Sequence, residues 1–451
     1  MNICDFDGLT GRVITSDDPY YEELRQVYNR AVNKFPLAIV YCQKETDVSN
    51  AVLWSRSHHV SLRIRNGGHN YEGYSTGNDI LAIDLSEMNQ ISIDETANLL
   101  TVQGGAKNRQ VYEFVSSMGY PFPGGTCPSV GVSGYALGGG WGLSCRYLGL
   151  GCDCLTQLRM INYEGTALTA SPTENPDLFW ALRGGGGGNF GIIVSMTFRL
   201  PGKVDKITLI DIRYPDSDQE KQSAFVQIWQ DWLTDTDPRI TLVSRIFNSR
   251  EDGLGILARG FFYGPPEAAL GIIQPLLRLG GVKYTLKYLP FLEAVNIIGS
   301  FYPPYEAFQS TSRFVLRDLT DCESCRLAAM IADRPQGSSY AALSFYALGG
   351  KVSQVDPEAT AFYYRNAKYI LWLNTVFDGC KCDNSAWIAD RFCYLQTITE
   401  GAYVNFPYDA LPRCHEEYYG SNACRLKMVK ERYDPLNIFS FPQGIGSKIC
   451  C

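Results

Sequence analysis

Alternating apolar and polar positions predict a short strand over residues 60–64, where the sequence runs Val-Ser-Leu-Arg-Ile. An apolar run at 38–42 predicts a buried strand, and a helix follows at 46–57 with Thr46 or Asp47 as its N-cap. Further elements are expected in this part: strands at 9–14, 80–85, 91–94, 99–102 and 158–162, and helices from 19, from 106 to 118 and at 176–182. One strand–helix–strand unit therefore leads directly into a turn at 66–68.

The pattern changes near residue 206, after which strands and helices alternate without glycine-rich connections. The expected strands are 206–213, 239–248, 255–263, 286–291, 339–347 and 369–374, and the expected helices are 219–233, 266–279 and 425–432. Strands and helices in this arrangement predict an antiparallel sheet backed by helices. The chain as a whole is expected to be an α+β protein.

Length and charge indicate how many domains to expect and which classes of binding partner to exclude. A chain of 451 residues is long for one hydrophobic core, so two domains are expected. A net charge of −7 and a pI of about 5.3 argue against nucleic acid or an anionic membrane as partner. The sequence has no apolar stretch long enough to cross a bilayer and no signal-like leader, so a cytoplasmic location is expected.

The fifteen cysteines are an odd number and suit free thiols in a reducing cytosol better than a disulfide scaffold. The pairs Cys322/Cys325 and Cys380/Cys382 could supply four thiolates to zinc. Their unequal spacing and the presence of only four histidines favour ordinary buried or surface thiols. We therefore expect no metal.

Two glycine-rich stretches carry the candidate chemistry. Asn66-Gly67-Gly68 predicts a tight turn whose backbone N–H groups can approach a ligand closely, and His69 leaves that turn. The second stretch runs from 124 to 142 around Cys127, and its glycine content predicts a loop that wraps an anionic or planar cofactor. No Gly-x-Gly-x-x-Gly fingerprint links a strand to a helix, so nicotinamide binding has no support.

In combination, these stretches resemble the berberine-bridge-enzyme-like (reticuline-oxidase-like) branch of the vanillyl-alcohol-oxidase / p-cresol methylhydroxylase flavoproteins. That branch carries Arg/Lys-x-Gly-Gly-His followed by Gly-x-Cys-Pro-x-Val-Gly-x-x-Gly, which this chain matches at 65–69 and 125–134. The resemblance implies FAD bonded to His69 through its 8α carbon and to Cys127 through C6. It also implies a two-subdomain FAD-binding domain of the p-cresol methylhydroxylase type at 1–205, a substrate-binding domain at 206–402, and a closing segment at 403–451 that returns to the FAD-binding domain.

The same resemblance assigns the remaining contacts to FAD. Residues 191–194 are expected beside the adenine end of the dinucleotide. The full set of expected contacts, besides His69 and Cys127, is Arg65, Asn66, Gly67, Gly68, Asn70, Gly125, Thr126, Ser129, Val130, Gly131, Ser133, Gly134, Tyr135, Gly139, Gly140, Gly142, Gly191, Ile193, Val194, Asn405 and Asn422.

Alcohol oxidation at a flavin needs hydride transfer to N5 and a base near the substrate hydroxyl. Tyr71 follows His69 by two residues and is expected to contact substrate. Many relatives place a tyrosine, often the proposed base, where this chain has Phe406, so the base is either absent or supplied by Tyr403 or Tyr408. Gln354 matches a position where relatives carry a polar or acidic side chain above the flavin, and it could orient a hydroxyl.

These residues predict an oxidoreductase that acts on an alcohol or a sugar hemiacetal. Val130, where relatives use a small side chain to admit oxygen, favours O2 as acceptor, whereas the free thiols suit a cell with little oxygen and another acceptor. The alternatives are a dehydrogenase or a C–C or C–N bond-forming enzyme on a secondary metabolite, and a flavin-loaded binding or structural protein that lost activity at Phe406. Aromatic runs at 301–305 and 362–364 could stack on a sugar or on an aromatic substrate.

Overall fold

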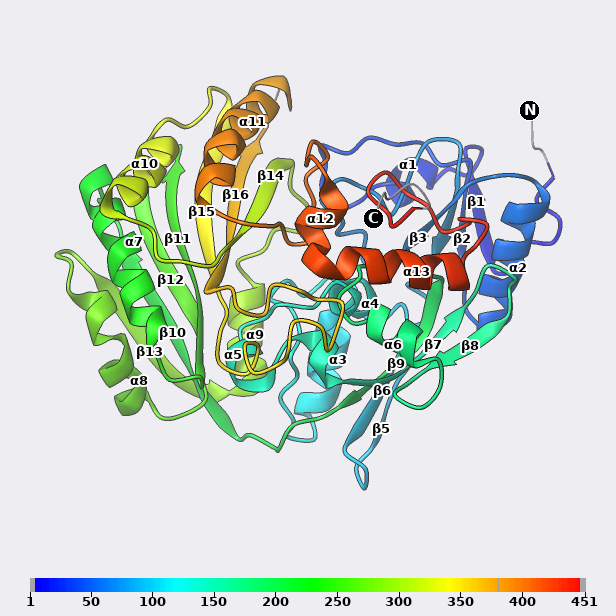
Figure 1. Cartoon of the computed structure of the whole chain (residues 1–451), viewed down its shortest axis with the longest axis horizontal. Helices are drawn as coiled ribbons and strands as arrows, with labels where there is room; N and C mark the ends of the chain where they lie inside the picture. The colour runs from blue at the N-terminus through cyan, green and yellow to red at the C-terminus, as the bar shows by residue number, and fades with distance from the viewer. Residues whose placement is uncertain (1–4, 379–380, 447–451) are drawn as a thin grey trace.

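The computed structural model describes residues 5–378 and 381–446, the side chains of residues 381 and 382 excepted, and these residues form three β-sheets (Figure 1). Two smaller sheets belong to the N-terminal part of the chain and the largest sheet to the middle part. Cys380 and Cys382, considered above for zinc, lie outside the residues whose side chains are described. Across the described residues, no helix combines the length and apolar character needed to cross a membrane.

The first sheet contains the strand–helix–strand unit predicted from the sequence. Its order is β1-β2-β4-β3, antiparallel between β1 and β2 and parallel elsewhere. The apolar positions of α2 pack on this sheet and form a separate small core with it. The elements are β1 (Arg12–Thr15), α1 (Tyr21–Leu24), β2 (Ala38–Tyr41), α2 (Glu45–Ser57), β3 (Leu62–Arg65) and β4 (Leu81–Asp84). The end of β3 delivers the turn at 66–68.

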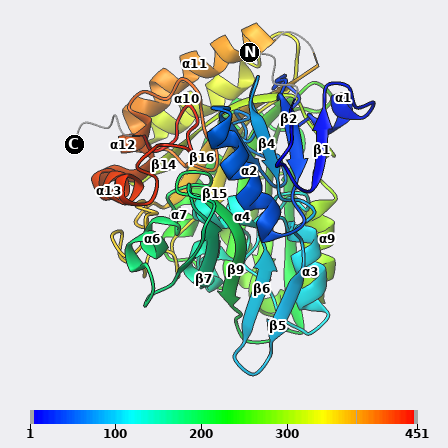
Figure 2. The ribbon, with the colours of Figure 1, turned by 90° about the vertical axis from the view of Figure 1, so that its right-hand side faces the viewer.

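The second sheet is antiparallel with the order β5-β6-β9-β7-β8, and Figure 2 shows it below α2. Its strands are β5 (Ile91–Asp94), β6 (Leu99–Gln103), β7 (Leu155–Ile161), β8 (Ala167–Ala170) and β9 (Ile192–Arg199). The helices inserted between these strands are α3 (Asn108–Ser116), α4 (Val132–Leu137), α5 (Cys145–Leu148), the 3-10 turn η1 (Gly151–Cys154) and α6 (Pro176–Ala181).

The prediction of a continuous loop around Cys127 was wrong at α4. Residues 132–137 are helical although Gly134 lies inside the helix. A glycine in a helix interior costs about 1 kcal/mol relative to alanine. The helix buries Val132, Tyr135 and Leu137, which offsets that cost.

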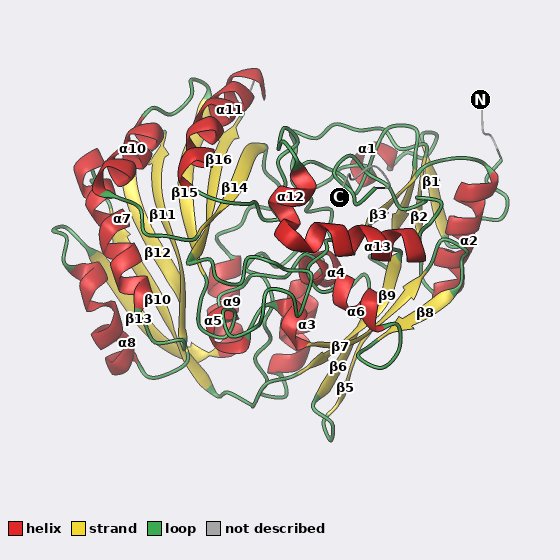
Figure 3. Ribbon diagram, in the orientation of Figure 1, coloured by secondary structure: helices red, strands yellow, loops and turns green. Residues whose placement is uncertain are grey.

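The third sheet has seven antiparallel strands in the order β13-β10-β12-β11-β15-β16-β14, and helices cover its outer face (Figure 3). Trp229 of α7, for example, packs on Phe345 of β15. The expected antiparallel sheet backed by helices is confirmed, although the hydrophobic pattern did not predict α9, β14, α10 or α11. The strands are β10 (Lys206–Tyr214), β11 (Ile240–Ser249), β12 (Gly253–Phe262), β13 (Lys283–Pro290), β14 (Phe308–Val315), β15 (Ser338–Ala347) and β16 (Tyr369–Phe377). The helices are α7 (Gln219–Thr234), α8 (Pro266–Ile273), the 3-10 turn η2 (Gln274–Leu277), α9 (Phe291–Gly299), α10 (Asp321–Ala332) and α11 (Lys381–Ile398).

The last segment returns to the N-terminal part of the chain. It contains α12 (Cys414–Tyr419), the turn η3 (Gly420–Asn422) and α13 (Ala423–Tyr433), which packs beside α6 (Figure 1). Lys430 of α13 donates a hydrogen bond to the Asn189 carbonyl oxygen at 2.6 Å. The expected division at residue 205 falls in the connection between β9 and β10.

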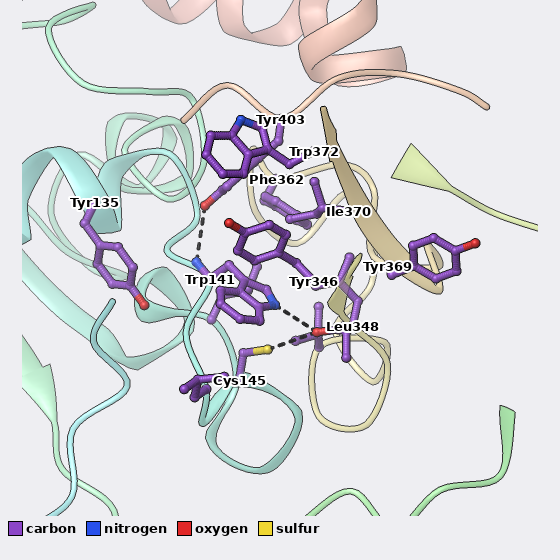
Figure 4. Packing of buried hydrophobic residues seen from close by; sticks show 14 of the residues in the cluster. Tyr135, Trp141, Cys145, Tyr346, Leu348, Phe362, Tyr369, Ile370, Trp372 and Tyr403 are labelled. Carbon is purple, nitrogen blue, oxygen red and sulfur yellow. Dashed lines mark hydrogen bonds between the residues drawn. The ribbon is translucent and has the colours of Figure 1, made fainter. Parts of the chain in front are cut away.

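Buried aromatic residues join the three segments at the centre of the molecule (Figure 4). The indole N–H of Trp141 donates to the Ala347 carbonyl oxygen on β15 at 2.8 Å. The backbone N–H of the same tryptophan donates to the Tyr403 hydroxyl at 3.2 Å. One residue of the N-terminal part thus fixes both the large sheet and the closing segment.

Candidate functional site

A cavity of about 420 Å³ lies between the N-terminal part and the inner face of the large sheet. This size falls in the range of small-molecule sites. Its walls come from residues 62–85, 125–143 and 186–193 on one side, from 243–259 and 298–376 on the sheet side, and from 403–407 and 439–443 of the closing segment. Segments far apart in sequence therefore build one site.

The two glycine-rich stretches pack against each other at one wall of this cavity. A Cβ atom on Gly67 would lie 2.5 Å from the Ser129 carbonyl oxygen, and one on Gly131 would lie 2.3 Å from Asn66. The Asn66 amide donates to the Gly104 carbonyl oxygen at 2.7 Å and to the Ser133 hydroxyl at 3.1 Å. Only glycine allows the two turns to approach this closely.

His69 and Cys127 meet at the hydroxyl group of Ser129. The His69 Nε2 atom lies 2.8 Å from Ser129 Oγ, and the Cys127 sulfur lies 3.5 Å from the same oxygen. The imidazole also stacks on Tyr28, with ring centroids 4.1 Å apart. An imidazole and a thiol from separate turns are thus held beside each other at the cavity wall.

Burial sets the protonation states of this pair. Burial, followed by the nearby Lys107 cation, lowers the pKa of His69 to about 3, so its ring is neutral at physiological pH. Burial raises the pKa of Cys127, against hydrogen bonds at Ser129 that favour the thiolate. Both side chains are neutral at pH 7, and a neutral imidazole has a free lone pair on one ring nitrogen.

The backbone around His69 fits an anionic, planar cofactor. The N–H groups of Gly67, Gly68, His69 and Asn70 donate to no group of the described chain. Backbone N–H groups left free in a turn form an anion-binding concavity. A Cβ atom on Gly134 would meet nothing within 4 Å, because this glycine borders the cavity.

Aromatic rings line the part of the cavity around Tyr71. Tyr71 stacks on Phe406, with ring centroids 5.3 Å apart, and meets Phe308 edge-on at 4.9 Å. Burial raises the pKa of Tyr71 well above its ordinary value, as do the neighbouring phenols, first Tyr346. The Tyr71 hydroxyl makes no hydrogen bond to the residues that the structure describes, and Tyr71 lines the cavity.

The Tyr403 hydroxyl, unlike that of Tyr71, is hydrogen-bonded to the protein. Its hydroxyl oxygen accepts hydrogen bonds from the backbone N–H groups of Gly140 and Trp141 at 3.0 and 3.2 Å, and from the Asn405 amide at 3.1 Å. Figure 4 shows the hydroxyl directed at the Trp141 backbone. Burial raises the pKa of Tyr403 to about 12, although these donors favour the phenolate. The oxygen is already surrounded by protein donors.

Sequence reasoning missed the polar groups on the large sheet. Arg245 of β11 and Arg259 of β12 line the cavity, as do Asn374 of β16 and Glu306 before β14. Tyr302 belongs to the aromatic run 301–305 that was expected to stack on a substrate, and its hydroxyl lies 2.7 Å from Thr126 Oγ1, beside Cys127. An arginine inside an otherwise apolar predicted strand was the available signal for Arg245 and Arg259.

Many expected cofactor contacts do line the cavity. Ser129 does not, but it binds His69 and Cys127 as described. The lining residues among the predictions are Asn66, Gly67, Gly68, His69, Asn70, Tyr71, Gly125, Thr126, Cys127, Val130, Gly131, Ser133, Gly134, Tyr135, Gly191, Ile193, Tyr403 and Asn405.

Six expected contacts lie away from the cavity: Arg65, Gly139, Gly140, Gly142, Val194 and Asn422. Arg65 forms a buried ion pair with Asp84 and holds β3 to β4. Val194 belongs to the small core under α2. Asn422 donates to the backbone oxygens of Pro357 and Thr360 at 2.9 and 3.2 Å.

The three glycines of this set support the wall from behind. The backbone N–H of Gly140 donates to Tyr403, and a Cβ atom on Gly142 would lie 2.0 Å from the Gly124 carbonyl oxygen. A Cβ atom on Gly139 would lie 2.7 Å from the ring of Phe362. These positions need glycine for packing between chain segments.

Two of the expected catalytic residues do not line the cavity. Tyr408 is buried against Phe392, with ring centroids 5.0 Å apart, and does not line the cavity. Gln354 lies on an exposed loop between β15 and β16, also outside the cavity. The family resemblance had placed Gln354 above the flavin, whereas in this structure its loop lies at the surface.

Comparisons with known proteins identify the family of this chain. Residues 36–171 match the family model of the FAD binding domain, and residues 402–446 match the model described as berberine and berberine like. The chain is 38% identical over 449 residues to the FAD-linked oxidoreductase YgaK of Bacillus subtilis, covering 97% of each chain. It is 28% identical to the xylooligosaccharide oxidase of Thermothelomyces thermophilus, covering 93% of this chain and 88% of that one.

Solved structures show the same fold. A chitooligosaccharide oxidase superposes with a TM-score of 0.88 at 25% identity, covering 97% of this chain and 98% of the other. BBE-like 1 of Physcomitrella patens superposes with a TM-score of 0.90 at 24% identity, covering 98% of both chains. With a close relative along nearly its whole length and both family models matched, this chain belongs to the berberine-bridge-enzyme-like FAD-linked oxidoreductases.

Proposed function

We propose that this protein is an oxidase with FAD bonded to both His69 and Cys127, that it oxidises an alcohol or a sugar hemiacetal hydroxyl, and that its electrons pass to O2. The observation that carries the proposal is the meeting of His69 and Cys127 at the Ser129 hydroxyl, on the wall of the central cavity. The two side chains come from different turns, as attachment at two points of one ring edge requires.

The surrounding residues fit the cofactor. The free N–H groups of Gly67 to Asn70 can hold its anionic part, and Gly134 leaves room for its planar part. Ser129 orients the imidazole and the thiol toward a shared partner. When bound, FAD supplies the hydride acceptor, at flavin N5.

On the substrate side, we assign proton acceptance to Tyr71. Its hydroxyl lines the cavity without a protein partner, so a substrate hydroxyl can reach it. The Tyr403 oxygen already accepts three hydrogen bonds from N–H groups. Tyr403 instead holds the closing segment to the backbone at Gly140 and Trp141. Phe406 stacks on Tyr71 and keeps water from its ring.

Sugar substrates are supported by the relatives that are named as oligosaccharide oxidases. Oxygen as acceptor is supported by the same names and by Val130, which borders the cavity three residues after Cys127. A dehydrogenase, or a bond-forming enzyme with another acceptor, is the alternative outcome of the test below.

Two measurements test the proposal. Intact-protein mass should exceed that of the polypeptide by one FAD, and acid-precipitated protein should stay yellow. Anaerobic addition of sugars and aromatic alcohols should bleach the flavin absorbance, and air should restore it with formation of hydrogen peroxide. An unmodified mass would contradict the attachment, and a bleached flavin that air does not reoxidise would favour the alternative acceptor.

A further inference from the structure

Arg245 projects from the large sheet into the cavity, on the side opposite the two glycine-rich turns. It lies on β11, and Arg259 lies diagonally across on β12, where it faces Val243 in the strand register. Since side chains two positions apart on a strand share a face, both arginines present themselves to the same space. Tyr302 lines the same cavity, and its hydroxyl is hydrogen-bonded to that of Thr126, beside Cys127.

Arg245 is half-buried at the cavity wall, and its partners differ from those of the buried arginines among the described residues. Arg146 donates to backbone carbonyl oxygens, among them that of Ile240 at 3.0 Å. The other four each pair with a carboxylate: Arg25 with Glu22, Arg65 with Asp84, Arg313 with Glu417, and Arg365 with Asp153. Arg245 instead contacts hydroxyl groups, Ser344 Oγ at 2.9 Å and Tyr340 at 3.4 Å, and no described carboxylate forms an ion pair with it.

The neighbouring charged groups do not neutralise the Arg245 guanidinium. Arg259 pairs with Asp211 at 2.8 Å, but Asp211 is shared with Arg213 at 2.7 Å. Glu306 lines the same cavity and forms no ion pair in the described chain. Burial raises the pKa of Glu306, against the attraction of Arg245, which weakens its contribution as a counter-ion. The sheet side of the cavity is therefore positive.

A half-buried guanidinium without a counter-ion is unfavourable, and its planar donor array matches a carboxylate. We propose that Arg245 binds a carboxylate of the substrate, so that the preferred substrate is an acidic alcohol such as a uronic acid or an oligosaccharide that carries one. This inference rests on the proposed oxidase function for the oxidation itself. The carboxylate anchor does not depend on it, because an anion can bind Arg245 without being oxidised.

The kinetic test compares matched substrates on the holoenzyme. Anaerobic flavin reduction is measured with glucose and glucuronate, xylobiose and an aldouronic disaccharide, and benzyl alcohol and 4-(hydroxymethyl)benzoate. We expect the acidic member to be preferred in kcat/KM by roughly ten- to hundred-fold, the usual worth of a hydrogen bond to a charged group. Arg245→Gln should abolish that preference, chiefly through KM, and Arg245→Lys should retain part of it. Equal or better reduction by the neutral members would overturn the proposal.

A binding test separates this inference from the oxidase assignment. Methyl β-glucuronide, which has no hemiacetal hydroxyl, should perturb the flavin spectrum at lower concentration than methyl β-glucoside, and Arg245→Gln should remove the difference. Arg239→Gln is the control, because it removes the same charge from an exposed arginine that pairs with Asp237. This variant should keep the difference between the two glycosides. If no substrate reduces the flavin but the glucuronide still binds preferentially, the oxidase proposal fails and the carboxylate site stands. If both glycosides bind alike, the carboxylate site fails whatever the enzyme oxidises.

Discussion

Phe406 lies face to face with Tyr71, their ring planes inclined by only 11° and their centroids 5.3 Å apart. Phe406 has no ionisable proton, so Tyr71 is the one member of this pair that carries a hydroxyl group. Phe406 contributes packing alone. Stacked rings of this kind contribute about 0.5–1.5 kcal/mol beyond area burial, which holds Tyr71 in one orientation.

Replacing Tyr71 by phenylalanine should slow anaerobic flavin reduction by roughly 10²- to 10⁴-fold, the usual contribution of a positioned acid or base. The stack on Phe406 survives this change, so flavin attachment and thermal stability should match those of the wild type. Stopped-flow absorbance measures the reduction, and intact mass measures the attachment. Reduction at the wild-type rate would remove Tyr71 from the mechanism.

The pH dependence follows from the direction of the Tyr71 pKa shift. Burial raises this pKa well above its ordinary value, and proton acceptance requires the ionised phenolate. Below the pKa the ionised fraction grows roughly tenfold per pH unit, so the reduction rate should climb steadily from pH 6 to 9 without a plateau. The Tyr71→Phe variant should lose that slope. A bell-shaped profile centred near neutrality, shared by both proteins, would point to another base.

Ser129→Ala removes the hydroxyl that touches both proposed attachment residues. We expect a mixture of doubly attached, singly attached and unattached flavin, because the imidazole and the thiol lose their common orienting group. His69→Ala and Cys127→Ala should each retain one bond, and only the double variant should release all its flavin on acid precipitation. Denaturing mass spectrometry of peptides separates these species, and full double attachment in Ser129→Ala would show that the hydroxyl is dispensable.

Gly67→Ala should destabilise the protein by about 1–3 kcal/mol, the usual cost of overpacking. The added Cβ atom would lie 2.5 Å from the Ser129 carbonyl oxygen and would push the two turns apart. Urea unfolding measures the loss. Gly202→Ala, where a Cβ atom meets nothing within 4 Å, is the matched control and should unfold at nearly the wild-type midpoint.

The site could be predicted from sequence wherever local geometry decides it. The turn at 66–68 and the stretch around Cys127 are set by glycines near one another in sequence, and the family resemblance added the expectation that His69 and Cys127 face one cofactor. The residues on the sheet side of the cavity could not be predicted in this way. Both faces of the large sheet are buried, one under helices such as α7 and one against the cavity, so alternation does not tell which face carries Arg245 or Asn374.

The other misses have related physical causes. Gln354 was expected above the flavin from the family resemblance, but the connection between β15 and β16 that carries it runs along the surface. The helix α4 was missed because glycine content was weighed without the tertiary burial that stabilises it. Long-range packing decided both positions, and a single sequence carries little information about it.

Lys430→Met tests how the closing segment is held to the rest of the chain. The ammonium group is 2% exposed, pairs with Asp434 at 2.6 Å, and donates to the carbonyl oxygens of Asn189 and Phe439 at 2.6 and 2.7 Å. Removing it leaves a buried carboxylate and two unpaired carbonyl groups, so we expect a loss of about 3–5 kcal/mol in the free energy of unfolding. Because Phe439 also lines the cavity, the variant should attach less flavin as well.

On the same helix, the exposed pair of Arg432 with Asp177 provides the control, and Arg432→Met should cost less than about 1 kcal/mol in the free energy of unfolding. Equal losses in the two variants would show that the buried lysine does not hold the segment in place.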